Sequence, residues 1–224
     1  MNLRIFETPA DLISAAARAI LQRLEPGVPT TIAISGGSTP KPLYEWLASQ
    51  QLDQFPITWV VVDERYVPPA DPQYNAGMIE RTLFANGLPA GHRFLRFRTE
   101  LQDPAKTAEA FEDEWRAMNL TRLDLILLGC GDDGHTASLF PGTTALHAEG
   151  IAAAVYVPRL EQWRVTLTLP VIREAGLRLV LAAGESKAPI LRDVRAGVEH
   201  PVALATRELD SWWLVDRAAA SKLL

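Results

Sequence analysis

Residues 57–63 read Ile-Thr-Trp-Val-Val-Val-Asp, and this stretch predicts the fold class. Four successive apolar residues, Trp59 to Val62, give a strand with apolar side chains on both of its faces. A strand of this kind needs cover on both sides, which helices provide in sheets whose strands run parallel. The stretch therefore predicts a central strand of an α/β sheet.

Strands and helices alternate along the rest of the chain. Thr8-Pro9 combines a capping hydroxyl with a proline at the first helical position, which predicts a helix to about Leu24. Further helices are expected over residues 40–48, 75–84, 104–118, 185–195 and 217–224, with a short one after His135. Strands are expected over residues 30–35, 57–63, 93–97, 123–128, 153–157, 164–169, 177–183, 202–205 and 212–215.

This order predicts a single domain over residues 1–224. We expect a doubly wound, mainly parallel sheet with helices on both faces, as in Rossmann-like folds. The length suits one large domain, and a hydrophobic content of 48% with 22% charged residues is enough to build one core.

Charge and cysteine content exclude several classes of function. Twenty-two basic against 27 acidic residues give a net charge of -5, which offers no general attraction for nucleic acid or an anionic membrane. No stretch reaches the ~20 apolar residues of a membrane span, and the chain start lacks a signal-type run. The one cysteine, Cys130, excludes an intramolecular disulfide and fits a reducing compartment, so we expect a cytoplasmic protein.

The residues that follow the predicted strands are the candidates for chemistry. Ligands of open parallel sheets bind beyond the carboxyl ends of the strands. If the strands are parallel, four such ends lie at one edge of the sheet and face one crevice. They are residues 35–39, 63–65, 129–135 and 183–187.

Residues 35–39 read Ser-Gly-Gly-Ser-Thr and lead into a predicted helix. Exposed backbone N–H groups and the helix dipole in such a turn favour an anion, and phosphate is the natural ligand. The alternative is a tight turn in which Ser38 or Thr39 only caps the helix. A Walker loop is excluded because no Gly-Lys-Ser/Thr follows at the required spacing.

The loop over residues 129–135 reads Gly-Cys-Gly-Asp-Asp-Gly-His. Its glycines match the dinucleotide pattern, but Asp132 and Asp133 place negative charge where a pyrophosphate would sit, and the next strand lacks the ribose-binding acid. His135 is the better indication, because histidine can activate water near neutral pH and Asp133 can fix its tautomer.

Two cations at the other strand ends have two interpretations each. Arg65, in Asp63-Glu64-Arg65, belongs either to a surface ion-pair cluster or to a site for an oxyanion or phosphate. Lys187 is either a solvated lysine at a helix start or a phosphate contact. We expect no metal site, since the remaining histidines lack ligand spacing, and no serine hydrolase, since no nucleophile elbow is present.

These motifs resemble the 6-phosphogluconolactonases of the pentose phosphate pathway over essentially the whole chain. The block over residues 133–141, Asp-Gly-His-Thr-Ala-Ser-Leu-Phe-Pro, is the most specific. Tyr74 departs from the serine usual in the family before Asn75, and Cys130 from a frequent methionine. The other matching stretches are residues 35–40, 63–65 with Asn75, 164–168, Gly184 with Lys187, and Trp213 with Asp216.

The resemblance implies a fold shared with glucosamine-6-phosphate deaminases and hydrolysis of 6-phospho-glucono-1,5-lactone without a cofactor or metal. It implies His135 as general base, Asp133 as the residue that orients it or shapes the loop, and Arg65 at the oxyanion or the phosphate. The partner it implies is a small phosphorylated sugar lactone, bound by a monomer or weak homo-oligomer. The implied substrate- and phosphate-binding residues are Ser35, Gly36, Gly37, Ser38, Thr39, Asp63, Asn75, Arg164 and Lys187.

Two alternatives remain open at this point. A glucosamine-6-phosphate deaminase-type isomerase carries a glutamate in the same turn, where this chain has Phe140. A non-catalytic sugar-phosphate-sensing domain would need a DNA-binding module, and the one helix expected before the first predicted strand is too little for a helix-turn-helix unit.

Overall fold

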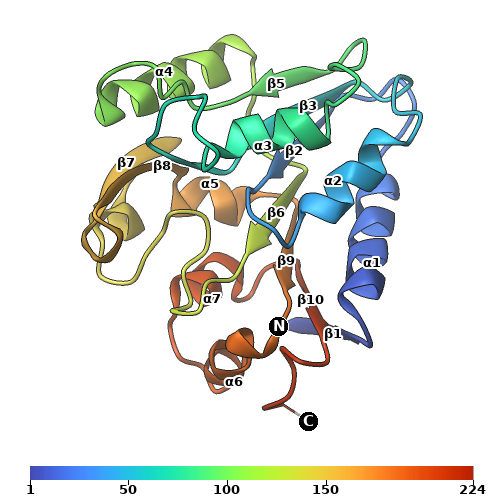
Figure 1. Cartoon of the computed structure of the whole chain (residues 1–224), viewed down its shortest axis with the longest axis vertical. Helices are drawn as coiled ribbons and strands as arrows, with labels where there is room; N and C mark the ends of the chain where they lie inside the picture. The colour runs from blue at the N-terminus through green and yellow to red at the C-terminus, as the bar shows by residue number, and fades with distance from the viewer. Residues whose placement is uncertain (224) are drawn as a thin grey trace.

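The computed structural model describes residues 1–223, and its strands form two sheets (Figure 1). The strands are β1 (Asn2–Phe6), β2 (Thr30–Ile34), β3 (Ile57–Val61), β4 (Asp63–Arg65), β5 (Arg93–Leu95), β6 (Leu125–Gly129), β7 (Ala152–Val157), β8 (Gln162–Leu167), β9 (Leu177–Ala182) and β10 (Ser211–Asp216). The helices are α1 (Pro9–Leu21), α2 (Lys41–Ala48), α3 (Asn75–Thr82), α4 (Pro104–Ala117), α5 (Leu169–Glu174), α6 (Ala188–Arg195) and α7 (Pro201–Thr206), with 3-10 turns at Thr144–His147, Pro158–Leu160 and Glu185–Lys187.

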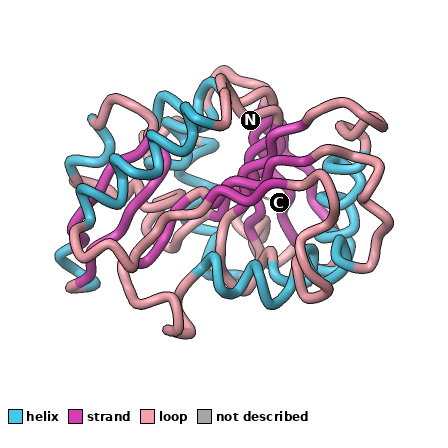
Figure 2. The backbone as a smooth tube through the Cα atoms, turned by 90° about the horizontal axis from the view of Figure 1, so that it is seen from above, coloured by secondary structure: helices cyan, strands magenta, loops and turns pink. Residues whose placement is uncertain are grey.

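The larger sheet is parallel throughout, in the order β1-β10-β9-β6-β2-β3-β5. The chain runs outward from β2 to β3 and β5, then returns to β6 on the other side of β2. Right-handed crossovers therefore place α1, α2 and α3 on one face and the later helices on the other. In agreement, α1 contacts α2, α2 contacts α3, and α5 contacts α7. Figure 2 shows helices on both sides of the strands.

The predicted character of residues 57–63 is confirmed. Every residue of β3 is buried, and the indole of Trp59 is among the largest fully buried side chains. The apolar side chains from both faces of the sheet belong to one connected core. The predicted α1 start is also confirmed, because the Thr8 hydroxyl accepts a hydrogen bond from the Asp11 backbone at 3.2 Å.

The smaller sheet was not predicted. It is antiparallel, in the order β4-β8-β7. The expected strand over residues 57–63 ends at Val61, and residues 63–65 leave the main sheet to pair with β8. The expected strands over 153–157 and 164–169 are β7 and β8, and only four residues join them. Such a short connection permits a hairpin but no parallel crossover.

Several other expectations about secondary structure were wrong. The expected strand over residues 202–205 is helix α7, for which Pro201 supplies the first residue. Residues 217–223 form turns instead of a closing helix, and Leu224 lies outside the described residues.

Strand β1 and helix α5 were missed. In β1 the cause is its position at the sheet edge, where half-exposed side chains hide the pattern. The short helix expected after His135 is a Thr136–Leu139 bridge followed by turns.

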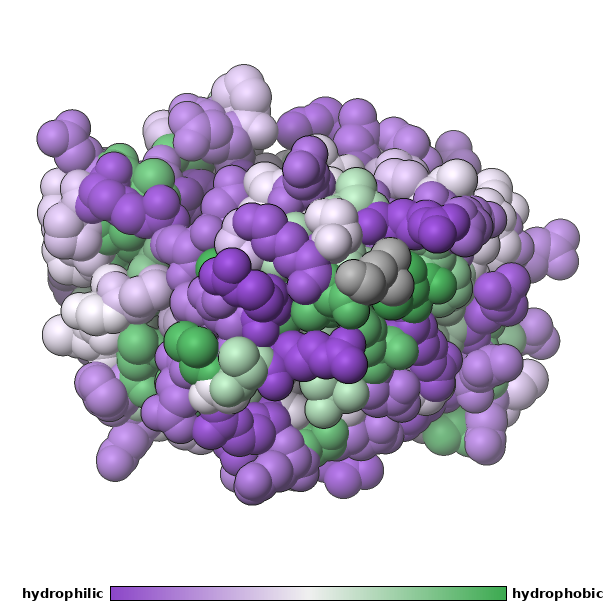
Figure 3. Space-filling view, turned by 90° about the horizontal axis from the view of Figure 1, so that it is seen from below, coloured by the Kyte–Doolittle hydropathy of each residue, from purple (hydrophilic) through white to green (hydrophobic). Residues whose placement is uncertain are grey.

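Most of the face seen in Figure 3 is hydrophilic. Among the helices described for residues 1–223, none combines the length and apolar character that crossing a membrane requires.

Glu112 joins the smaller sheet to α4. Its Oε1 accepts hydrogen bonds from the backbone N–H of Ile151 at 2.8 Å and of Ala152 at 3.1 Å, and its Oε2 pairs with Arg116 at 2.5 Å. Burial raises the pKa of Glu112, but the two N–H groups and Arg116 outweigh it and hold that pKa below the ordinary value of 4.5. The ionised carboxylate therefore fixes the start of β7 on the helix.

We expect Glu112→Gln to lower the free energy of unfolding by about 1 kcal/mol at pH 7, because charged acceptors bond more strongly than neutral ones. A lowered folded-state pKa gives stability that is complete above the unfolded pKa and lost as pH falls through the folded one. The difference from wild type should therefore shrink below about pH 4 in urea titrations. Glu109→Gln, on an exposed position of the same helix, is the control, and an equal pH dependence there would contradict the prediction.

Candidate active site

The parallel order brings the four predicted strand ends to one edge of the main sheet. Strands β9, β6, β2 and β3 are neighbours in that sheet. The direction of winding reverses between β6 and β2, so the loops that follow these two strands diverge around a crevice. These loops carry His135 and the Gly-Gly turn, and residues 63–65 begin directly beyond β3.

His135 and Asp133 form the central pair of this edge. Nδ1 of the imidazole lies 2.5 Å from Asp133 Oδ1, which also accepts the backbone N–H of His135 at 3.1 Å. A carboxylate at Nδ1 favours the tautomer that carries its proton there, which leaves the Nε2 lone pair free. The side chain of His135 is 28% exposed, so a small molecule can reach it.

Asp133 stays ionised in this arrangement. Burial raises its pKa, but the hydrogen bonds and charge of His135, with the charge of Arg159, outweigh that effect and hold the pKa below its ordinary value. The negative charge of Asp133 is therefore available to a protonated imidazole.

The glycine pattern of this loop serves the imidazole. A Cβ on Gly131 would lie 2.0 Å from His135 Nδ1, so the ring occupies space that any side chain there would fill. Gly134 has φ +78°, in the left-handed region that favours glycine. The match to a dinucleotide motif thus has a different physical cause, in agreement with the interpretation from the sequence.

Phe140 forms the floor beneath the pair. It is buried and stacks on the His135 ring, with centroids 4.2 Å apart and planes at 26°. The guanidinium groups of Arg159 and Arg164 lie over the same ring, 5.1 Å and 6.0 Å from its centroid. One aromatic ring therefore gathers the histidine and two cations.

Two arginines face each other across the smaller sheet. Arg65 of β4 pairs in register with Arg164 of β8, and like charges directly opposite are unfavourable without an anion between them. Burial lowers the pKa of Arg164, and within residues 1–223 its buried Nε has no hydrogen-bond partner. Arg65 donates to the Gln73 carbonyl at 2.8 Å. This arrangement suits an anionic ligand.

Asp63 joins this arginine pair to the histidine loop. Its Oδ2 accepts the hydroxyl hydrogen of Ser138 at 2.6 Å, and the Ser138 backbone N–H donates to Thr166 at 3.2 Å. Ser138 is fully buried. This cross-link fixes the position of β4 relative to the residues that follow His135.

The Gly-Gly turn packs against Asn75. A Cβ on Gly36 would lie 1.8 Å from Asn75 Oδ1, and Asn75 Nδ2 donates to the Asp63 carbonyl at 2.8 Å. Gly37 has φ +103°. The predicted turn, with Ser35 buried and Ser38 exposed, therefore lies against the predicted residues of β4 and α3.

Glu64 is a residue whose role the sequence analysis missed. Its carboxyl group is fully buried and accepts hydrogen bonds from the backbone N–H groups of Arg65 at 2.9 Å, Asn75 at 2.6 Å and Ala76 at 2.8 Å. Burial raises the pKa of Glu64 to about 8, against the lowering effect of these bonds. Two features of the sequence could have indicated this role. One is the acid next to Arg65, and the other is the helix that begins at Asn75 without a capping side chain of its own.

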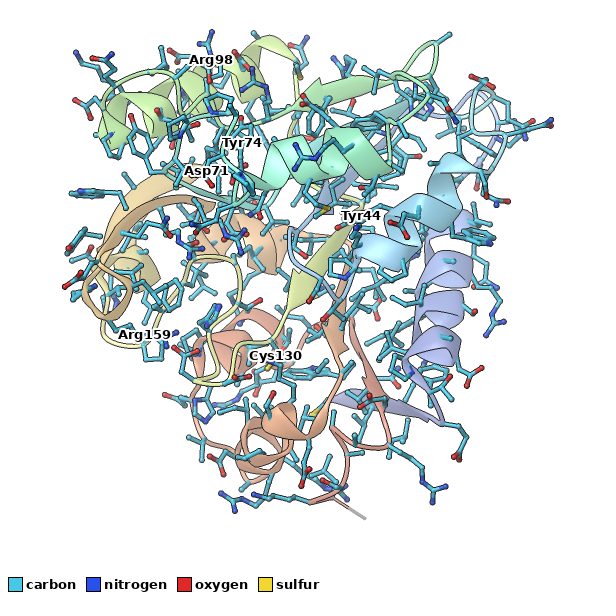
Figure 4. All side chains as sticks on the ribbon, viewed as in Figure 1. Tyr44, Asp71, Tyr74, Arg98, Cys130 and Arg159 are labelled. Carbon is cyan, nitrogen blue, oxygen red and sulfur yellow. The ribbon has the colours of Figure 1, made fainter. Side chains whose placement is uncertain are left out.

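Lys187 and Tyr74 both have polar partners within the protein. Lys187 Nζ is paired with Asp132, which also accepts from Ser186 Oγ at 3.1 Å, so this lysine is held beside the histidine loop. Tyr74 is buried, and its hydroxyl donates to the Phe97 carbonyl at 2.8 Å and accepts from Arg96 at 2.7 Å. The hydroxyl of Tyr74, a residue labelled in Figure 4, is thus bonded to the two residues that follow β5. Within residues 1–223, no group of three or more His, Cys, Asp or Glu side chains is placed to hold a metal ion.

Comparison with known proteins gives a consistent picture. Residues 7–213 match the model of the family of glucosamine-6-phosphate isomerases and 6-phosphogluconolactonases. The chain is 32% identical to the 6-phosphogluconolactonase of Haemophilus influenzae, over 100% of both chains. It superimposes on the 6-phosphogluconolactonase of Thermotoga maritima with a TM-score of 0.85 at 26% identity, covering 96% of this chain and 99% of that one. A monomeric glucosamine-6-phosphate deaminase shares the fold, with a TM-score of 0.83 at 21% identity over 99% and 100% of the two chains.

Gly131 and Gly129 form a matched pair that tests the packing of the imidazole. We expect Gly131→Ala to displace the His135 ring from Asp133, because the added Cβ occupies the place of Nδ1. Gly129→Ala should leave the ring in place, since a Cβ there meets nothing within 4 Å. Crystal structures of the two variants, with melting temperatures to verify folding, provide the measurement. An unmoved ring in Gly131→Ala would show that the loop yields instead.

Proposed function

The chain belongs to the family of glucosamine-6-phosphate isomerases and 6-phosphogluconolactonases, and we propose that its site hydrolyses 6-phospho-D-glucono-1,5-lactone to 6-phospho-D-gluconate by general-base activation of water. The enzyme is a 6-phosphogluconolactonase of the oxidative pentose phosphate pathway. The observation that carries the mechanism is the Asp133–His135 pair, which leaves Nε2 free at an exposed edge.

His135 is the base in this proposal. Nε2 removes a proton from water as the water oxygen attacks the lactone carbonyl carbon, and Asp133 stabilises the imidazolium that forms. The ionised state of Asp133 supports this role. When the bond between the carbonyl carbon and the ring oxygen breaks, the imidazolium returns its proton to that oxygen, which becomes a hydroxyl group. The new carboxylic acid then loses its own proton to solvent.

The reaction presents two negative groups that the site must bind, the oxyanion of the intermediate and the phosphate of the substrate. Attack on the carbonyl creates an oxyanion, and fixed donors stabilise such a charge without reorganisation. Arg164 lies over the ring of Phe140, on which His135 stacks, and Arg65 is the cross-strand neighbour of Arg164. We therefore assign the two arginines to the anionic groups of the substrate and the intermediate. The turn Gly36-Gly37-Ser38-Thr39, with Ser35 at its start, and Lys187 are assigned to the phosphate.

Asp63 and Asn75 are assigned to the sugar side of the site. Both are buried, Asp63 as the first residue of β4 and Asn75 between the Gly-Gly turn and that strand, and Asn75 Oδ1 has no partner among the described residues. An amide oxygen in this position can accept a hydrogen bond from a substrate hydroxyl.

We also propose that residues 1–224 form one lactonase domain that acts in the cytoplasm as a monomer or weak homo-oligomer. One connected core among the described residues supports the single domain. The net charge of -5 argues against nucleic acid and anionic membranes as partners.

We expect His135→Ala to lower kcat by about 10²-fold to 10⁴-fold with little change in KM, since a base acts in the transition state and adds little to substrate binding. The assay uses freshly generated 6-phosphogluconolactone with spontaneous hydrolysis subtracted. The variant should keep its melting temperature. Turnover close to that of wild type at saturating substrate would remove His135 from the mechanism.

The enzyme should release no ammonia from glucosamine 6-phosphate. Deamination needs ring opening and a proton shuttle between adjacent carbons, which requires a second acid-base group beside the histidine. The deaminase pattern places a glutamate where this chain has Phe140, which cannot transfer a proton and is buried under the imidazole.

Asp63, which follows the end of β3, is a carboxylate that could substitute, and it is already bonded to Ser138. A coupled ammonia assay at high enzyme concentration provides the measurement. Enzyme-dependent ammonia release that disappears in His135→Ala would favour the deaminase reaction.

A further inference from the structure

Asp133 is shared by two partners. While Oδ1 bonds His135, Oδ2 lies 2.6 Å from an Nη atom of Arg159. The distance is that of a charge-assisted hydrogen bond. The carboxylate that orients the histidine is therefore also held by a cation from a different part of the chain.

Arg159 reaches this position from the hairpin of the smaller sheet. It lies in the turn Pro158–Leu160 between β7 and β8 and is labelled at the left of Figure 4. Its guanidinium also lies 5.1 Å from the centroid of Phe140, on which His135 stacks. Each of four residues thus contacts the next in a closed cycle: Asp133, His135, Phe140 and Arg159. Arg159 is the one that comes from the hairpin.

Other charged groups lie on the elements around the histidine loop, and they make their contacts away from Asp133. Arg164 of β8 lies over Phe140 but faces Arg65 across the sheet. Asp132 is paired with Lys187, and Asp63 with Ser138. His200, packed against Gly134, faces Asp193 at 3.6 Å. Within residues 1–223, Arg159 is the arginine that bonds directly to the Asp133 carboxylate.

We propose that Arg159 is a positioning residue that shares the Asp133 carboxylate with His135 and so limits the basicity of the imidazole. A cation on Oδ2 withdraws negative charge from Oδ1 and weakens the hold of Asp133 on an imidazolium. The imidazole then remains neutral, and able to accept a proton, at lower pH. The same bond fixes the plane of the carboxylate and hence of the ring. The inference rests on the proposed role of His135 as base.

The test compares Arg159→Ala, Arg159→Lys and the control Leu160→Ala by the pH dependence of kcat/KM. Leu160 is an exposed neighbour in the same turn. In Arg159→Ala we expect the acidic limb of the pH profile to move to higher pH, because Asp133 then stabilises the imidazolium more strongly. The shift should be only about half a unit, because the lost charge is partly solvated. This shift lowers kcat/KM about threefold on that limb. Arg159→Lys should restore most of it, and Leu160→Ala should follow wild type.

Two further measurements separate the possible outcomes. The NMR signals of the His135 ring report the same shift without turnover, so the inference can be judged even if His135 proves not to be the base. In an Asp133→Asn background, removal of Arg159 should move the limb and the signals by less than half as much.

An unmoved limb with unmoved ring signals would overturn the proposal. So would a raised KM with an unchanged pH profile, which would make Arg159 a substrate ligand only. An equal shift in the Asp133→Asn background would also overturn it, since the effect would then bypass the carboxylate.

Discussion

The structure depends on the burial of both faces of its central strands. A strand such as β3, with every side chain buried, can exist only between two layers of helices. Helical crossovers on both faces make the strands parallel, and parallel strands end at the same edge. That constraint brings together the Gly-Gly turn, residues 63–65, the His135 loop and Lys187, which are spread over residues 36–187 of the sequence.

The smaller, antiparallel sheet supplies the arginines of the site. Strand β4 leaves the end of β3 and pairs with β8, which brings Arg164 opposite Arg65 and the hairpin residue Arg159 to Asp133. Loops at the edge of the main sheet supply backbone N–H groups and the histidine. The antiparallel strands supply the arginines and hold them in register, so the site is built where the two sheets meet.

The sequence predicted those features that depend on local chemistry. Residues 57–63 predicted a two-sided strand, Thr8-Pro9 predicted the start of α1, and the glycine-rich ends predicted the loops of the site. It failed where pairing decides the structure. No local pattern tells that β7 and β8 form a separate sheet or that edge strand β1 pairs with β10. Glu64 and Arg159 were missed for the same reason, because their partners are brought near only by the fold. At α7, by contrast, Pro201 was an available helix-start signal that the apolar stretch after it obscured.

Phe140 shows how one position can separate two reactions within this fold. A glutamate there would offer a second proton-transfer group beside the histidine, as the deaminase pattern does. The phenyl ring instead stacks on the imidazole and lies beneath two guanidinium groups. Lactone hydrolysis needs a single base and stabilised negative charge, whereas isomerisation needs a second acid-base group. Phe140 therefore offers no group that moves protons between carbons, and the same ring supplies the surface on which the proposed base and its neighbouring cations pack.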